Sequence, residues 1–175
     1  NLLSGGSVFL YYGEELGMKG SGKDENKRAP MYWSKDDKAE GMCKGPADME
    51  DFQMKFDSLE EQQEDPDSIY NYVKQVIRIR NQNPAIARGT TTYLEQYSGE
   101  QCFALTRSYE GSNLLLLGNT SAEAVSVDLT GLTVGGTTAE ELVLLGELYT
   151  GEETAERAGT VVTLPAYSIL ILGEE

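Results

Sequence analysis

A short apolar run near the start of the chain limits the fold more than any other feature of the sequence. Residues 7–12 read Ser-Val-Phe-Leu-Tyr-Tyr and are bounded by Gly5, Gly6 and Gly13. Apolar and aromatic residues between glycines are typical of a strand. A strand with one face in water would alternate apolar and polar residues, but this run is apolar on both faces. Because parallel sheets are covered on both faces, the run predicts a buried strand of a parallel sheet.

One amphipathic helix is predicted over residues 68–82. Its apolar residues recur at the spacing of one helical face, and basic residues fall toward the C-terminal half, where the helix dipole favours them. Asp67 or Ser68 can serve as the N-cap. Asn83 and Pro84 should end the helix, because the residue before a proline avoids helical geometry.

Residues 34–66 contain no clear element and are expected to form a long surface excursion. The segment holds eleven acidic residues and four lysines. Two patterns for its apolar residues stay open: a strand through Phe52, Met54 and Phe56, or a helical turn in which Met49 joins the two phenylalanines. The acids lack the Asp-x-Asp-x-Asp-Gly spacing of a calcium loop, which favours a solvated loop.

The pattern changes near residue 90 to short strands separated by turn residues. Val125, Val127 and Leu129 alternate with polar residues, as in a half-buried strand. Pro165 should divide the last apolar stretch in two. Seven or so strands at this spacing predict an antiparallel sandwich or Greek-key barrel. The candidate strands are 92–97, 101–108, 113–119, 123–129, 142–148, 160–164 and 166–172.

Composition excludes several classes of function. The net charge of −15 argues against nucleic acid and anionic membranes as partners, since both attract positive charge. The chain has no histidine, which removes Ser-His-Asp catalysis and most zinc sites. Its two cysteines, Cys43 and Cys102, lack metal-binding spacing and form no disulfide framework. No apolar run is long enough for a transmembrane helix.

Two motifs near the start resemble the alpha-amylase family of glycoside hydrolases. They read Tyr-Tyr-Gly-Glu-Glu-Leu-Gly-Met at 11–18 and Arg-Ala-Pro-Met-Tyr-Trp at 28–33, and are similar to the family's last barrel strand and the loop that follows it. Glu25 departs from the pattern, since the family usually has proline there. The helix resembles the family's eighth barrel helix, and the later strands resemble its C-terminal sandwich.

The resemblance implies a mainly β fold with two parts, divided near Arg88 and Gly89. Residues 90–175 would form an antiparallel Greek-key β-sandwich. Residues 1–89 would be a βα remnant of a (β/α)₈ catalytic barrel.

The same resemblance implies that Arg28, Tyr32, Trp33 and Glu15 lie near a sugar cleft, because loops after barrel strands build the active site. A guanidinium can donate to sugar hydroxyls, and aromatic faces can pack on pyranose rings. The residue types alone leave structural roles open, such as a salt bridge for Glu15 and core packing for Trp33. We assign no catalytic residue and no metal ligand. The family's catalytic carboxylates belong to motifs that this sequence does not contain.

We therefore expect the C-terminal portion of a retaining glycoside hydrolase that acts on α-glucans or maltooligosaccharides, inactive on its own. The alternative is a non-catalytic sandwich module that stabilises the barrel or binds carbohydrate. Expected partners are the glucan and the rest of the barrel, and the isolated chain could self-associate through its apolar strand. We expect no cofactor, with calcium in the longer enzyme left open, and a soluble protein that is cytoplasmic or secreted.

Overall fold

The computed structural model describes residues 1–174, and its contacts group into two compact units. One unit comprises residues 1–8 and the chain from Val76 onward, and the other comprises Phe9–Gln75. The sequence-based division near Arg88 and Gly89 differs from this grouping and stays a prediction. No helix within residues 1–174 has the length and apolar character needed to cross a membrane.

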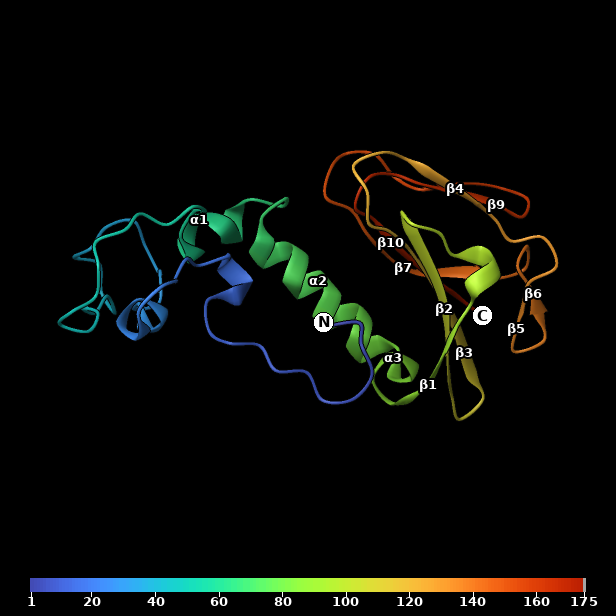
Figure 1. The fold of residues 1–175 in the computed structure, drawn as a ribbon, viewed down its shortest axis with the longest axis horizontal. Helices are drawn as coiled ribbons and strands as arrows, with labels where there is room; N and C mark the ends of the chain where they lie inside the picture. Colours follow the sequence, from blue (N-terminus) through green and yellow to red (C-terminus); the bar gives the residue numbers. More distant parts are fainter. Residues whose placement is uncertain (175) are drawn as a thin grey trace. The chain divides into compact units, whose positions relative to one another are not determined.

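The strands lie in the second half of the chain, as the turn pattern predicts, and form antiparallel sheets (Figure 1). A five-stranded sheet has the order β1-β2-β3-β10-β7, a three-stranded sheet has the order β4-β9-β8, and β5 pairs with β6. After β8 and β9 in the three-stranded sheet, the last strand, β10, returns to the five-stranded sheet between β3 and β7. The chain therefore crosses between the two sheets, as in a Greek key. The strands are β1 (Thr90–Tyr93), β2 (Cys102–Tyr109), β3 (Ser112–Asn119), β4 (Val125–Asp128), β5 (Thr133–Val134), β6 (Thr137–Thr138), β7 (Val143–Leu148), β8 (Glu156–Ala158), β9 (Val161–Leu164) and β10 (Ile169–Gly173).

The core lies between the two larger sheets. Leu115 and Leu117 of β3 belong to one buried cluster with Val162 and Leu164 of β9. On each strand these residues alternate with residues of the opposite face, which is the spacing that points side chains to one side of a sheet. The mainly β, sandwich-type fold predicted from the sequence is confirmed.

The other face of the five-stranded sheet is also covered. Leu114 and Leu116 are 2% exposed and lie outside the cluster between the sheets. The short helix α3 (Pro84–Arg88) packs against β2 and β3 and contributes the buried Ala85 and Ile86 (Figure 1). The helix α3 was not predicted from the sequence, because Pro84 was expected only to end the preceding helix, and α3 begins at this proline.

Two arginines join separate segments of this unit through main-chain oxygens. Arg107 on β2 is 3% exposed and donates to the carbonyl oxygens of Ala85 and Ile86 at the end of α3. Arg80 donates to carbonyl oxygens of Leu2 and Ser4, at 2.9 and 2.6 Å. Burial, and to a smaller degree the charge of Arg80, lowers the pKa of Arg107. Arg107 thus ties β2 to α3, and Arg80 ties α2 to the first residues of the chain.

The long helix α2 (Ile69–Gln82) lies where the sequence predicts a helix at 68–82. The Ser68 hydroxyl accepts from the Asn71 amide at 3.2 Å, so Ser68 is the N-cap. The helix ends at Gln82, just before Asn83 and Pro84. A further helix, α1 (Leu59–Glu64), begins with a capping box between Ser58 and Glu61 inside the predicted excursion.

Three differences from the sequence-based prediction concern strands. Residues 7–12 form no strand, since no other strand pairs with them, and Phe9 is 85% exposed. The candidate strand 92–97 divides into the end of β1 and a 3₁₀ turn at Glu95–Tyr97 (η3). The short strands β5, β6 and β8 were not predicted because two or three residues show no periodicity.

The buried side-chain amide of Asn119 joins two turns that are far apart in the sequence, the turn after β3 and the turn between β9 and β10. The Asn119 side chain donates to the carbonyl oxygens of Leu164 and Pro165, at 3.2 and 2.9 Å, and to that of Glu123 at 2.7 Å. Its oxygen accepts from the Ser121 amide at 2.9 Å. The side chain therefore fixes the exit of β3 against the turn between β9 and β10.

We predict that Asn119→Ala lowers the free energy of unfolding by about 2–3 kcal/mol, because it leaves several buried polar atoms unpaired. Urea titration followed by circular dichroism measures the change. Asn81→Ala, at an exposed position of α2, is the control and should change stability by less than about 0.5 kcal/mol. Equal stability of the two variants would contradict the role of Asn119.

Candidate functional site

A cavity of about 530 Å³ lies within the unit formed by Phe9–Gln75. Its walls come from the 3₁₀ turn η1 (Glu14–Leu16), the 3₁₀ turn η2 (Asp24–Arg28) and the segments beside them. The lining residues are Tyr11, Tyr12, Gly13, Glu14, Met18, Lys19, Gly20, Asp24, Asn26, Lys27, Arg28 and Ala29.

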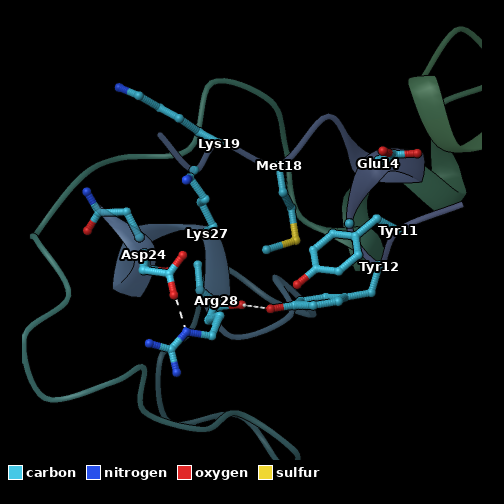
Figure 2. Close-up of a pocket in the computed structure, with 12 residues that line it drawn as sticks. Tyr11, Tyr12, Glu14, Met18, Lys19, Asp24, Lys27 and Arg28 are labelled. Carbon is cyan, nitrogen blue, oxygen red and sulfur yellow. Dashed lines mark hydrogen bonds between the residues drawn. The ribbon is translucent and has the colours of Figure 1, made fainter. Parts of the chain in front are cut away.

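Two tyrosines form the aromatic part of the cavity. The rings of Tyr11 and Tyr12 have centroids 4.7 Å apart, and both side chains are about half exposed. The Tyr12 hydroxyl donates to the Ala29 carbonyl at 2.9 Å, which ties one wall to the other. Burial, together with neighbouring Tyr11, raises the pKa of Tyr12. Figure 2 shows the Met18 thioether extending toward these rings.

A sharp turn follows the tyrosines. Gly13 has φ 87°, a left-handed backbone conformation that residues other than glycine rarely adopt. A Cβ atom there would lie 2.5 Å from the Met18 sulfur. The Glu15 carboxylate accepts from the Gly13 amide at 2.9 Å, so it turns back onto its own loop.

The charged side chains of the cavity are mixed in sign within a strongly acidic chain. Lys19, Lys27 and Arg28 line it together with Glu14 and Asp24. Arg28 donates to the Asp24 carbonyl at 3.4 Å (Figure 2). Its guanidinium also lies 3.7 Å from the Glu25 carboxylate. Because the Arg28 side chain is 55% exposed, most of its donors stay accessible to a ligand.

The floor of the cavity is held by a buried amide. Asn26 is 3% exposed and donates to the Ser21 carbonyl at 2.9 Å and to the Glu50 carboxylate at 2.8 Å. The Glu50 amide donates back to the Asn26 side-chain oxygen at 3.0 Å. This reciprocal pair fixes η2 against the acidic excursion.

A second buried amide anchors η1. Gln62 on α1 is 3% exposed, and its nitrogen donates to the carbonyl oxygens of Leu16 and Asp57, at 3.0 and 2.7 Å. Its side-chain oxygen accepts from the Tyr70 amide in the first turn of α2, at 3.1 Å. One side chain thus links the cavity wall to α1 and to the start of α2.

The Tyr32–Trp33 segment caps α1 through its main chain. The carbonyl oxygens of Tyr32 and Trp33 accept from the first two amides of the helix, Leu59 at 2.9 Å and Glu60 at 3.1 Å. These amides have no partner within the helix itself. The Trp33 side chain stays 43% exposed.

Of the four residues predicted from the sequence to lie near a sugar cleft, Arg28 lines the cavity. The other three, Glu15, Tyr32 and Trp33, are not among its lining residues. Their roles in binding substrate stay predictions.

Five further residues that line the cavity were not predicted from the sequence: Tyr11, Met18, Lys19, Asp24 and Lys27. The available signal was the four basic residues close together at 19–28 in an acidic chain, Lys19, Lys23, Lys27 and Arg28. A cavity between two short turns leaves no periodic trace in the sequence.

Within residues 1–174, no group of three or more acidic or cysteine side chains is arranged to hold a metal ion. The expectation of no cofactor is not tested by this observation and stays a prediction.

An antiparallel sandwich that follows an amphipathic helix, with an arginine- and tyrosine-lined loop before that helix, is the arrangement expected at the end of a (β/α)₈-barrel glycoside hydrolase. Residues 1–89 match the family model described as the catalytic domain of alpha-amylase. The chain belongs to the alpha-amylase family.

Individual relatives agree with this assignment. The structure of Eubacterium rectale Amy13B is 44% identical and superposes over the whole of this chain with a TM-score of 0.92. "Alpha-amylase 3" of Dictyoglomus thermophilum is 36% identical over 84 residues, which are 48% of this chain. Alpha-amylase SusG of Bacteroides thetaiotaomicron is 30% identical over 137 residues, 74% of this chain.

The chain spans only part of each relative. The matched regions are 33% of the Amy13B chain, 17% of "Alpha-amylase 3" and 19% of SusG. We therefore propose, and do not assign, the activity and substrates of a whole enzyme.

We predict that Gln62→Ala loosens the cavity, because the carbonyl of Leu16 and the amide of Tyr70 then lose a buried partner, at a cost of about 1–3 kcal/mol. Amide hydrogen exchange should become faster in residues 13–18 and at the start of α2. The neighbouring exposed Gln63→Ala is the matched control and should leave exchange unchanged. Unchanged exchange in both variants would remove Gln62 as the anchor.

Proposed function

We propose that this chain is part of a retaining glycoside hydrolase that acts on α-glucans or maltooligosaccharides. The observation that carries the proposal is the likeness to Amy13B over the full length of the chain, at 44% identity and a TM-score of 0.92. The family match over residues 1–89 supports it independently, since that segment contains the whole cavity.

The chemistry of the cavity suits a neutral, polyhydroxylated ligand. Arg28 offers several donors in a fixed plane, and the carboxylates of Glu14 and Asp24 are acceptors. The exposed faces of Tyr11 and Tyr12 supply apolar area of the kind against which a sugar ring packs. Cavities of this composition orient a ligand through a few polar groups and gain affinity from apolar contact.

The role we assign to the cavity is substrate positioning. Retaining hydrolysis requires a nucleophilic carboxylate and a separate carboxylic acid about 5 Å apart. The motifs that supply these groups in the family do not occur in this sequence, and we assign neither role to Glu14 or Glu15. The catalytic groups would come from the part of the enzyme that the chain does not span.

We predict that the purified chain releases no reducing sugar from maltoheptaose or soluble starch above the rate of a heat-treated sample. The physical reason is that a positioning cavity without the carboxylate pair does not lower the barrier to glycosidic cleavage. A reducing-end assay over several hours measures this. Turnover that persists through repeated purification, and that is lost in Glu14→Gln, would contradict the assignment.

We also predict that Arg28→Ala, in the longer enzyme of which the chain would be part, lowers kcat/KM for maltoheptaose by about 10–100-fold. A hydrogen bond from a charged donor contributes about 1.5–3 kcal/mol, which corresponds to that range. Arg78→Ala, at an exposed position of α2, is the matched control and should keep the parental value. An unchanged kcat/KM in Arg28→Ala would remove this residue from the substrate site.

A non-catalytic role for the sandwich is the second candidate. The observation that favours it is the sandwich's own buried core, which includes residues of both larger sheets. Such a module can stabilise the barrel without touching the substrate.

A further inference from the structure

A groove on the sandwich, outside the cavity described above, has the features of a second ligand site. It has a volume of about 610 Å³ and lies between the end of β1 with η3 on one side and the turn from β4 to β5 on the other. All of its lining residues belong to the unit that contains the sandwich. They are Tyr93, Leu94, Glu95, Gln96, Tyr97, Gly131, Leu132 and Thr133.

The groove rests on the sandwich core and is therefore preformed. Leu132 is 7% exposed and belongs to the core cluster, and Leu94 packs against that cluster. The Leu94 amide donates to the Ala104 carbonyl at 2.9 Å, and the Leu132 amide donates to the Leu129 carbonyl at 3.0 Å. A site that does not rearrange avoids part of the entropy cost of binding.

One hydrogen bond joins the two walls. The Tyr97 hydroxyl donates to the Thr130 carbonyl at 3.2 Å, across 33 residues of sequence. This bond fixes the Tyr97 ring relative to the β4–β5 turn. The neighbouring Ser98 hydroxyl donates to the Leu94 carbonyl at 2.9 Å, which holds η3 in the same place.

The groove combines aromatic area with uncharged polar groups. Tyr93 is 58% exposed, a large aromatic surface for a side chain in a strand. Gln96 and Thr133 are exposed and provide donors and acceptors, and Glu95 provides the only formal charge among the lining residues. Because no cation lines the groove, it does not suit phosphate or other anions. Aromatic and hydroxyl-binding groups together suit a neutral sugar.

We propose that this groove is a non-catalytic binding site for α-linked glucan chains. Glucose rings would lie against Tyr93 and Tyr97, and their hydroxyls would bond to Glu95, Gln96 and Thr133. The proposal rests on the proposed function, since the substrate of the enzyme supplies the ligand. A second site on the same molecule would raise the effective concentration of a polymeric substrate near the catalytic site.

The test is a titration of the 175-residue chain with maltoheptaose, followed by NMR shifts of the amides of Gln96, Gly131 and Thr133. We expect saturable shifts at these amides, and no such shifts with cellohexaose, whose β-linked chain has a different shape. Absence of shifts at these amides, or equal shifts with both sugars, would overturn the proposal.

Two variants locate the site. Tyr93→Ala should weaken the affinity at least about fivefold, because a ring contact of this kind contributes about 1 kcal/mol. Gln96→Ala, which alters an exposed side chain, should weaken it by a smaller factor. Tyr167→Ala is the matched control, since Tyr167 is 52% exposed and is not among the residues of the groove. Equal affinities of the Tyr93 and Tyr167 variants would overturn the proposal.

This inference and the proposed function fail in different ways. If the longer enzyme hydrolyses maltoheptaose but the groove amides do not shift, the proposed function stands and the second site is refuted. If the longer enzyme hydrolyses no α-linked glucan, the proposed function fails whatever the groove binds.

Discussion

The burial of strand β3 on both faces is the constraint on which the sandwich unit depends. Four consecutive leucines, Leu114–Leu117, are at most 2% exposed, so one pair must face the second sheet and the other pair must be covered by something else. Each buried leucine contributes about 1.5–3 kcal/mol relative to water. The second cover is α3, whose Ala85 and Ile86 are fully buried. A sandwich that lacked α3 would therefore expose a continuous apolar stripe.

Covering this face brings an arginine into the interior. Arg107 lies on the same face as Leu105, next to the end of α3, where it donates to the carbonyl oxygens of Ala85 and Ile86. A buried guanidinium is costly unless its donors are satisfied, and the helix end satisfies them. The charge and the helix terminus thus compensate each other, which explains why a five-residue helix persists at this place.

The sequence predicted those parts of the fold whose residues repeat. The helix at 68–82 shows one apolar face, and β4 alternates at Val125 and Val127, so both could be predicted from local pattern. The helix α1 has only the Ser58–Glu61 capping box as a local signal, and six residues are too few for periodicity. Residues 7–12 have the composition of a strand, but a strand forms only with a partner. The cavity at 11–29 depends on contacts from Gln62 and Glu50, which are remote in sequence.

The environment of Asn119 has a consequence for how the protein can be produced. Asn119-Thr120-Ser121 fits the acceptor motif for N-linked glycosylation. In the folded chain the nitrogen that would carry the glycan is buried and donates to three carbonyl oxygens. Folding and glycosylation therefore compete for the same atom. In a eukaryotic secretory host, a chain that acquired a glycan before folding would be unable to close the sandwich, whereas a chain that folded first would remain unmodified.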